Sequence, residues 1–170
     1  MGYVLRDYQK QASDKAVDFF NNPMAKYNAI EVLPTGAGKS LVLADIAYRL
    51  GGKTLIFSPS KEITKQNFQK MCSYGVLDCS VYSASLNSKN IGRITYATIG
   101  SAIHHMELFK HFDRIIIDEC HLVNSKGGMY ERFIRETGKK VLGLTATPYR
   151  LSTSSWGAML KFLTRTRPRI

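Results

Sequence analysis

The stretch at residues 29–50, AIEVLPTGAGKSLVLADIAYRL, constrains the fold more than any other part of the sequence. Its first five residues form a short apolar run of the kind found in buried strands. A turn of small residues follows, and Gly51-Gly52 later ends a helical pattern. One face of that pattern collects the apolar side chains of Leu43, Ile46, Ala47 and Leu50. A strand, a glycine-rich turn and a helix in this order predict an α/β fold.

The same alternation continues along the chain. Short apolar runs lie at residues 29–33, 54–58, 79–83, 93–97, 114–118 and 141–145. Further helical patterns lie at residues 61–74 and 129–137. Strands that alternate with helices predict a mainly parallel sheet flanked by helices on both faces. Ligands of such sheets bind at the carboxyl ends of the strands.

The turn LPTGAGKS, at residues 33–40, has the composition of a phosphate-binding loop, although Leu33 stands where the usual pattern has glycine. Backbone N–H groups of such a turn can surround an anion, and the helix that follows adds partial positive charge. In this arrangement Lys39 reaches the β- and γ-phosphates and the Ser40 hydroxyl ligates Mg²⁺. The predicted nucleotide loop comprises Pro34, Thr35, Gly36, Ala37, Gly38, Lys39 and Ser40.

The run at 114–118 leads into Asp118, Glu119, Cys120 and His121, which allow two interpretations. The last three can ligate a soft metal such as zinc, but no second Cys/His pair completes a tetrahedral site. In a phosphate-loop protein, an acid at a strand end, here Asp118, holds Mg²⁺. A neighbouring carboxylate, here Glu119, can accept a proton from the attacking water. The sequence favours this second interpretation, with Lys39, Asp118 and Glu119 as catalytic residues.

Charge indicates a polyanionic partner, because 24 Lys and Arg outnumber 13 Asp and Glu and give a net charge of +11. Residues 151–170 contribute four basic side chains and no acid. No apolar run approaches the roughly 18 residues that cross a bilayer, so no membrane partner is expected. The N-terminus lacks the apolar core of a signal peptide, and the odd cysteine number fits reduced thiols. We therefore expect a cytoplasmic protein.

Several motifs stand in the order typical of superfamily 2 helicases of the DEAD/DEAH type, which this chain resembles over nearly its whole length. They are LRDYQ (5–9) for the Q motif, LPTGAGKS (33–40) for motif I, SPSKEITKQ (58–66) for motif Ia, DECH (118–121) for motif II and GLTATPYR (143–150) for motif III. Two of these motifs, LRDYQ and GLTATPYR, are most similar to those of the RadD-like and XPB-like branch of the superfamily. That likeness favours a bacterial or phage origin.

The resemblance implies a three-layer RecA-like P-loop NTPase lobe at residues 1–150. A basic segment at 151–170 then leads toward a second RecA-like lobe of the same parent chain. ATP and Mg²⁺ are the implied cofactors, with Gln9 at the adenine edge and Arg6 near the ring. Family members complete the ATP site with arginine fingers from the second lobe, and no tail arginine matches that motif.

The resemblance also implies a nucleic-acid site and a link between it and ATP. The candidates for nucleic-acid contact are Ser58, Pro59, Ser60, Lys61, Thr98 and Ser101. The first three precede a helix whose free N–H groups can bind backbone phosphate, and Lys61 adds charge. The residues expected to couple the two sites are His121, Thr145 and Thr147.

The sequence thus predicts the first motor lobe of an ATP-driven helicase or translocase that hydrolyses ATP to ADP and phosphate, with DNA favoured over RNA as its track. A translocating subunit of a restriction or remodelling complex, without strand separation, is an alternative. Two alternatives outside motors are a small-molecule P-loop kinase and a nucleotide-gated binding module. The kinase has no need of SPSKEITKQ or LTATPYR, and the gated module has no need of Lys39, Asp118 and Glu119 together.

Overall fold

The computed structural model describes residues 3–26, 28–34, 36, 38–122, 128–146 and 160–165. Three residues of the predicted sites, Thr35, Ala37 and Thr147, lie outside these ranges. The strands are β1 (Asn28–Val32), β2 (Thr54–Phe57), β3 (Cys79–Ser83), β4 (Ser88–Lys89), β5 (Ile94–Ala97), β6 (Arg114–Asp118), β7 (Val141–Thr145) and β8 (Leu160–Arg165). The α-helices are α1 (Asp7–Asn21), α2 (Lys39–Leu50), α3 (Lys61–Ser73), α4 (Ile99–Ala102) and α5 (Met129–Thr137). Short 3₁₀ helices are η1 (Ala84–Leu86), η2 (Ile103–Phe109) and η3 (Cys120–Leu122).

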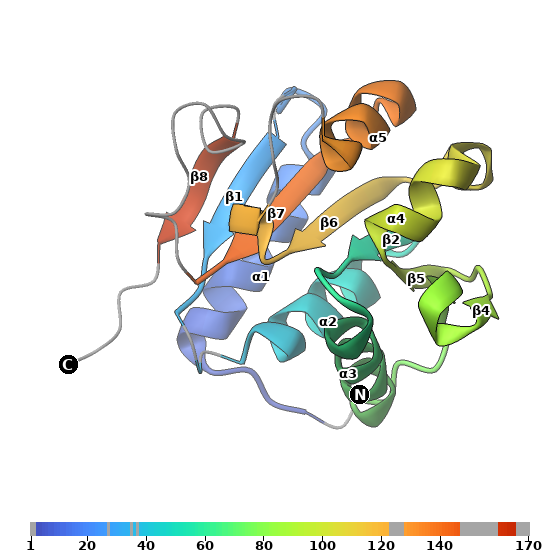
Figure 1. Cartoon of the computed structure of the whole chain (residues 1–170). Coiled ribbons are helices and arrows are strands. Elements are labelled where there is room, and N and C mark those ends of the chain that lie inside the picture. Colours follow the sequence, from blue (N-terminus) through green and yellow to red (C-terminus); the bar gives the residue numbers. More distant parts are fainter. Residues whose placement is uncertain are drawn as a thin grey trace.

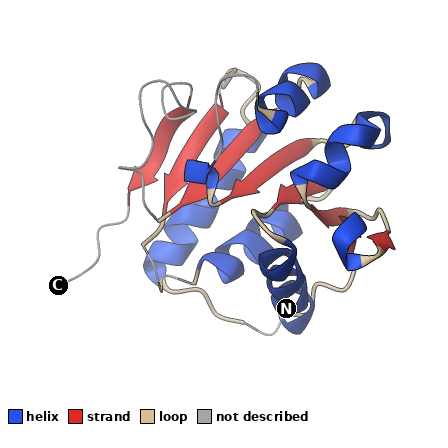
Figure 2. Ribbon diagram, viewed as in Figure 1, coloured by secondary structure: helices blue, strands red, loops and turns tan. Residues whose placement is uncertain are grey.

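The described strands form one sheet of eight in the order β4-β3-β5-β2-β6-β7-β1-β8 (Figure 1). Every neighbouring pair is parallel except β3 and β4, which are antiparallel. Parallel strands need crossover connections, and the helices supply them on the two faces of the sheet (Figure 2). None of the described helices combines the length and apolar character needed to span a membrane.

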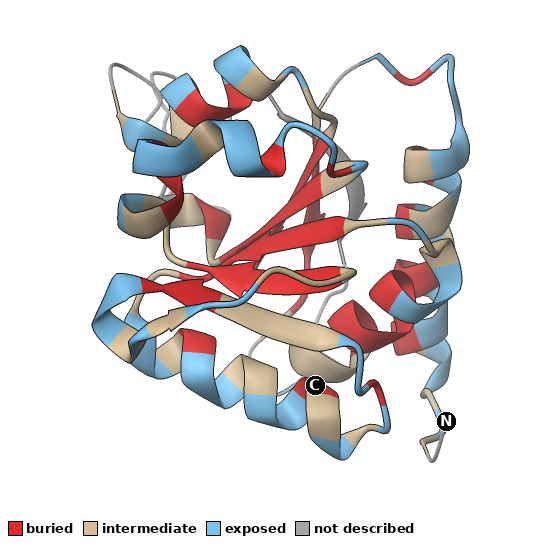
Figure 3. Cartoon of the chain, turned by 90° about the vertical axis from the view of Figure 1, so that its right-hand side faces the viewer, coloured by how far each residue is buried: buried red, intermediate tan, exposed pale blue. Residues whose placement is uncertain are grey.

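Two apolar layers hold the helices to the sheet. On one face, α1, α2 and α3 pack through side chains such as Ala16, Ile46 and Met71. On the other face, η2 and α5 pack through Phe109 and Phe133. Figure 3 shows the buried strands between helices whose outer sides are exposed. The predicted three-layer α/β architecture with a mainly parallel sheet is therefore confirmed.

The six predicted apolar runs correspond to β1, β2, β3, β5, β6 and β7. Two strands have no counterpart among them. Strand β4 is only two residues long, and β8 pairs in parallel with β1 at the sheet edge, with a register shift between Ile30 and Glu31. Because β8 lies within the basic segment 151–170, part of that segment extends the sheet. The predicted boundary at residue 150 stays a prediction.

The topology brings the motifs to one edge of the sheet. Asp118, the last residue of β6, is in register with Leu144 of β7, and Val32 of β1 is in register with Thr145 of β7. The Leu33 N–H continues this ladder by donating to the Thr145 carbonyl at 2.9 Å. The carboxyl ends of these three strands therefore carry the phosphate loop and motifs II and III side by side.

Candidate nucleotide site

The phosphate loop uses its glycines for backbone geometry. Gly36 and Gly38 have φ values of 80° and 73°, in the left-handed region that favours glycine. Gly38 is the N-cap of α2, and its carbonyl accepts from the Leu41 N–H at 3.0 Å. A β-carbon at Gly38 would also collide with the side-chain amide of Gln9. Glycine at this position therefore suits the left-handed backbone of the turn and leaves room for the Gln9 side chain.

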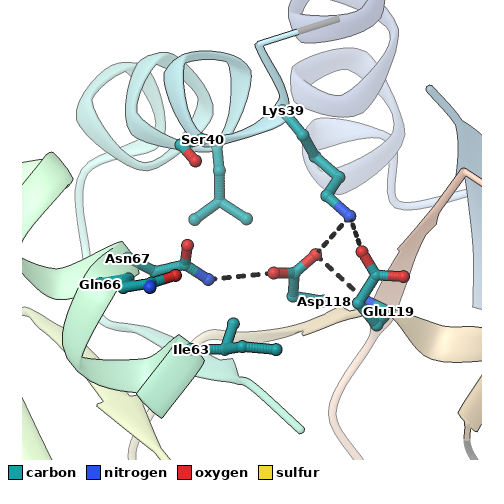
Figure 4. Close-up of a pocket in the computed structure, with 8 residues that line it drawn as sticks. Lys39, Ser40, Ile63, Gln66, Asn67, Asp118 and Glu119 are labelled. Carbon is teal, nitrogen blue, oxygen red and sulfur yellow. Dashed lines mark hydrogen bonds and ion pairs between the residues drawn. The ribbon is translucent and has the colours of Figure 1, made fainter. Parts of the chain in front are cut away.

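Lys39 lies between the two acids of motif II. Its Nζ is 3.1 Å from Asp118 Oδ1 and forms a second ion pair with the Glu119 carboxylate (Figure 4). Burial opposes the ammonium charge, but the two carboxylates outweigh burial and raise the pKa of Lys39 above its usual value. Lys39 is therefore a charged group held at the mouth of the loop, available to an anionic ligand.

Asp118 is 5% exposed and receives hydrogen bonds on both oxygens. Oδ1 accepts from the Glu119 N–H at 3.0 Å, and Oδ2 accepts from Asn67 Nδ2 at 3.0 Å. Glu119 has a φ of 55°, an uncommon value for a residue with a β-carbon. Such strain is concentrated at functional sites. Here it turns the chain from β6 into η3 while the Glu119 carboxylate stays beside Lys39.

These side chains line a pocket of about 220 Å³. Its lining residues are Lys39, Ser40, Leu43, Ile63, Gln66, Asn67, Asp118 and Glu119 (Figure 4). Mg²⁺ prefers hard oxygen ligands, often one or two carboxylates together with phosphate and water. The Ser40 hydroxyl and the Asp118 carboxylate lie on this one pocket, so the residues present fit a magnesium ion.

The comparisons with known proteins agree with this geometry. Residues 2–150 match the family described as "Type III restriction enzyme, res subunit". The chain belongs to this family. The predicted recognition as an N-terminal RecA-like lobe of the superfamily 2 helicase type is thereby confirmed.

Two curated relatives carry the same lobe within longer chains. The chain is 33% identical over 147 residues to a protein named DNA 3'-5' translocase XPB2 from Sulfurisphaera tokodaii. It is 31% identical over 159 residues to one named DNA 3'-5' helicase XPB from Mycobacterium tuberculosis. These alignments cover 86% and 88% of this chain but only 31% and 27% of the relatives.

Solved structures share the fold. The UvsW helicase from bacteriophage T4 matches with a TM-score of 0.74 at 22% identity, over 94% of this chain and 59% of that chain. A nuclease-deletion mutant of the Type ISP restriction-modification enzyme LlaGI matches with a TM-score of 0.71 at 21% identity, over 97% of this chain and 20% of that chain. At such identities the likeness supports the fold alone.

In this family lobe, the two predicted adenine residues, Arg6 and Gln9, lie outside the pocket lining, at the N-terminal end of α1. Gln9 is 5% exposed, and its Oε1 accepts from the Arg6 N–H at 2.9 Å, which forms part of the capping box of α1. Its amide lies against Gly38, as described above. Arg6 is exposed at the N-cap. The structure thus places Gln9 beside the phosphate loop, and its contact with adenine stays a prediction.

His121 bridges motifs II and III. Its Nδ1 is 2.9 Å from Thr145 Oγ1 and 3.3 Å from Glu119 Oε2. The neighbouring Cys120 is fully buried, and a β-carbon on Gly143 would lie 2.7 Å from its Sγ. The thiol therefore packs in the core against β7, which leaves the zinc interpretation of Glu119, Cys120 and His121 without support. The coupling role of His121 and Thr145 stays a prediction.

The motif Ia residues lie at the start of α3. Ser60 is the N-cap and accepts from the Ile63 N–H at 3.3 Å, Pro59 precedes it half-buried, and Lys61 is exposed. Ser58 is 1% exposed and lies beneath this turn. This leaves the exposed Lys61 and the α3 N-terminus as the accessible part of the predicted nucleic-acid site.

Thr98 and Ser101 are engaged within the chain itself. Ser101 Oγ accepts from the Ala84 N–H at 2.9 Å, and Thr98 Oγ1 donates to Ser101 Oγ at 3.0 Å. These hydrogen bonds hold α4 against the turn after β3. Contact of either hydroxyl with nucleic acid stays a prediction.

Motif Ia (58–66) includes Ile63 and Gln66, but the sequence analysis predicts a pocket role neither for them nor for Asn67, and all three line the pocket. The sequence does contain a signal for these residues, namely the spacing of three and four positions between Ile63 and the other two. Residues three and four positions apart share a helical face. Once Ile63 faces the pocket, Gln66 and Asn67 follow. What the sequence does not give is the rotation of α3 about its axis, which depends on packing.

Proposed function

We propose that this chain is the ATP-binding motor lobe of a nucleic-acid-dependent ATPase, a DNA helicase or translocase that hydrolyses ATP to ADP and phosphate. The observation that carries the proposal is the meeting of Lys39, Ser40, Asp118 and Glu119 in one pocket at the carboxyl edge of the sheet. The family match and the relatives named as DNA helicase and translocase support it.

The residues divide the chemistry between them. Lys39 exchanges its ion pairs with the two acids for the β- and γ-phosphates of ATP. A magnesium ion held by Ser40 and Asp118 would neutralise charge on the phosphate oxygens. Glu119 orients the attacking water and accepts its proton, a role that contributes about 10²- to 10⁴-fold in rate. Gln9, beside Gly38, makes a two-point amide contact with adenine.

The nucleic-acid track lies along the N-terminus of α3. Free N–H groups at a helix N-terminus bind backbone phosphate, and Lys61 stands exposed there. The net charge of +11 favours association with a polyanion without reading its sequence.

The test measures binding of a fluorescent ATP analogue by this chain, with and without Mg²⁺. The parent and Glu119→Gln are expected to bind the analogue with Mg²⁺, whereas Lys39→Ala is expected to lose most of that binding. Lys26→Ala removes an exposed lysine away from the pocket and is the matched control. Binding that is unaffected by the Lys39 change would overturn the assignment of the site.

A second arm measures binding of single-stranded DNA and RNA of equal sequence at several salt concentrations. For single strands, log K falls by about 0.7 per phosphate contact for each unit of log salt. Lys61→Ala is expected to make the slope shallower by about that amount. Tighter binding of RNA than DNA would contradict the choice of DNA.

The alternative motor, which translocates without separating strands, is favoured by the restriction-enzyme description of the family. Both motors share the pocket described here. Separation of a labelled duplex, assayed with a second RecA-like lobe present, distinguishes them, because only a helicase releases the strand.

A further inference from the structure

The two carboxylate oxygens of Asp118 have different partners, and the sequence motifs account for the partners of only one oxygen. Oδ1 faces the phosphate loop and its own strand end, where Lys39 Nζ lies at 3.1 Å and the Glu119 N–H donates at 3.0 Å. Oδ2 faces α3 and accepts from Asn67 Nδ2 at 3.0 Å (Figure 4). The second contact joins an element that carries the predicted nucleic-acid site to the predicted magnesium ligand.

The chemistry of the two partners fixes the orientation of the Asn67 amide. An ionised carboxylate only accepts hydrogen bonds, so the amide nitrogen must face Asp118. The same nitrogen lies 3.4 Å from Ser58 Oγ, at the end of β2. In Figure 4 the amide oxygen is directed away from Asp118. Asn67 therefore bridges the ends of β2 and β6 from the side of α3.

Helix α3 can carry a displacement from its N-terminus to this amide. Ser60 caps the helix and its carbonyl also accepts from Thr64 Oγ1 at 2.7 Å, so the first turn is well held. Asn67 lies seven positions after Ser60, which is about 10 Å of helix at 1.5 Å per residue. If a phosphate bound at Ser60 and Lys61 shifts α3, it would therefore also move the Asn67 amide that donates a hydrogen bond to Asp118.

We propose that Asn67 is a positioning residue, which fixes the Asp118 carboxylate for Mg²⁺·ATP and makes its placement depend on α3. The inference rests on the proposed function and deepens it. Asn67 lines the pocket, but its amide nitrogen donates to Asp118, and the role assigned to it is exerted through that carboxylate. Groups that orient a metal-binding carboxylate typically contribute about 10- to 100-fold in metal affinity.

The experiment titrates Mg²⁺ at a fixed concentration of fluorescent ATP analogue and records the Mg²⁺ concentration at half-saturation. Asn67→Ala removes the donor and is expected to raise that concentration about 10- to 100-fold. Asn67→Asp keeps the shape but sets a like charge against Asp118, and the rise is expected to be at least as large. Gln69→Ala, on the same helix but exposed and outside the pocket, is the control and should match the parent.

Melting temperatures and analogue binding without Mg²⁺ separate positioning from a loss of folding, because a positioning role leaves both close to the parent. The titration is then repeated with saturating single-stranded DNA. The DNA is expected to shift half-saturation in the parent and in Gln69→Ala, and to shift it less in Asn67→Ala.

A Mg²⁺ requirement of Asn67→Ala equal to that of Gln69→Ala would overturn the inference and leave the proposed function standing. An equal DNA-induced shift in Asn67→Ala and the parent would overturn the dependence on α3. If analogue binding by the parent does not depend on Mg²⁺, and Lys39→Ala binds the analogue as well as the parent does, the proposed function is overturned and the inference with it.

Discussion

At the residue scale, His121 is the contact through which motif II meets motif III. Its Nδ1 reaches both Thr145 Oγ1 and Glu119 Oε2. We predict that His121→Ala retains Mg²⁺-dependent ATP binding, because the imidazole is not among the residues that line the pocket. The variant should lose the effect of nucleic acid on the ATP site, since the link from Glu119 to β7 is cut.

The measurement is the ratio of phosphate release with and without single-stranded DNA, assayed with a second RecA-like lobe present, together with analogue affinity. His111→Ala, which removes an exposed imidazole, is the control. Allosteric couplings usually amount to about 5- to 150-fold. A fall of this ratio toward one in His121→Ala is therefore readily detected. Equal stimulation of His121→Ala and the parent would refute the coupling role.

Two thiols lie close enough to react with each other. The Sγ atoms of Cys72 and Cys79 are 3.2 Å apart, and a disulfide needs about 2.05 Å. Burial and the neighbouring Cys72 thiol raise the pKa of Cys79 to about 12, so thiolate is scarce at neutral pH. Diamide treatment is expected to join these two cysteines slowly and to leave the buried Cys120 free. Peptide mapping identifies the bridge; a crosslink through Cys120 would contradict the packing described.

At the scale of elements, β1 contains a carboxyl group within the core. Glu31 is fully buried, and neither carboxylate oxygen has a hydrogen-bond partner among the described residues. Burial raises the pKa of Glu31 to about 8, against the opposing effect of the Lys15 charge. The ordinary value is 4.5, so between these two values the folded chain keeps a proton that the unfolded chain releases.

The free energy of unfolding should therefore fall as the pH rises from about 4.5 to about 8, by up to about 1.4 kcal/mol per pH unit from this group. Glu31→Gln removes the titration and should flatten the dependence, so that it gains stability over the parent as pH increases. Urea unfolding at pH 5, 6, 7 and 8 measures the trend. Asp18→Asn, at an exposed carboxyl of α1, is the control, and a parent slope that survives Glu31→Gln would contradict the prediction.

The elements also show what the sequence can and cannot predict. Apolar runs and helical periodicity locate the central strands and α2, α3 and α5, because these are buried against neighbours. Strand β4 has two residues and no periodicity, and β8 is an edge strand within a basic segment. The motifs likewise gave Lys39, Ser40, Asp118 and Glu119, whereas Asn67 depends on how α3 packs. Local patterns predict buried elements and loops, and tertiary contacts decide the rest.

At the scale of the whole molecule, the pocket is built by one lobe. Its described lining comes from α2, α3 and the end of β6, and includes a single cation, Lys39. The chain spans less than a third of the two curated relatives described above. The resemblance to superfamily 2 helicases implies arginine fingers from a second lobe, so we expect this lobe to supply the acids and the loop but not every positive charge that the site needs.

We therefore predict that this chain alone binds Mg²⁺·ATP but hydrolyses it poorly, because an arginine finger can contribute about 10³- to 10⁵-fold in rate. Phosphate release is measured with and without single-stranded DNA, and Glu119→Gln defines the background. A second lobe added in trans should raise the rate. Substantial turnover by the chain alone that Glu119→Gln abolishes would contradict the prediction. If that rate rose more than linearly with protein concentration, a second copy of the chain would be completing the site in place of the second lobe.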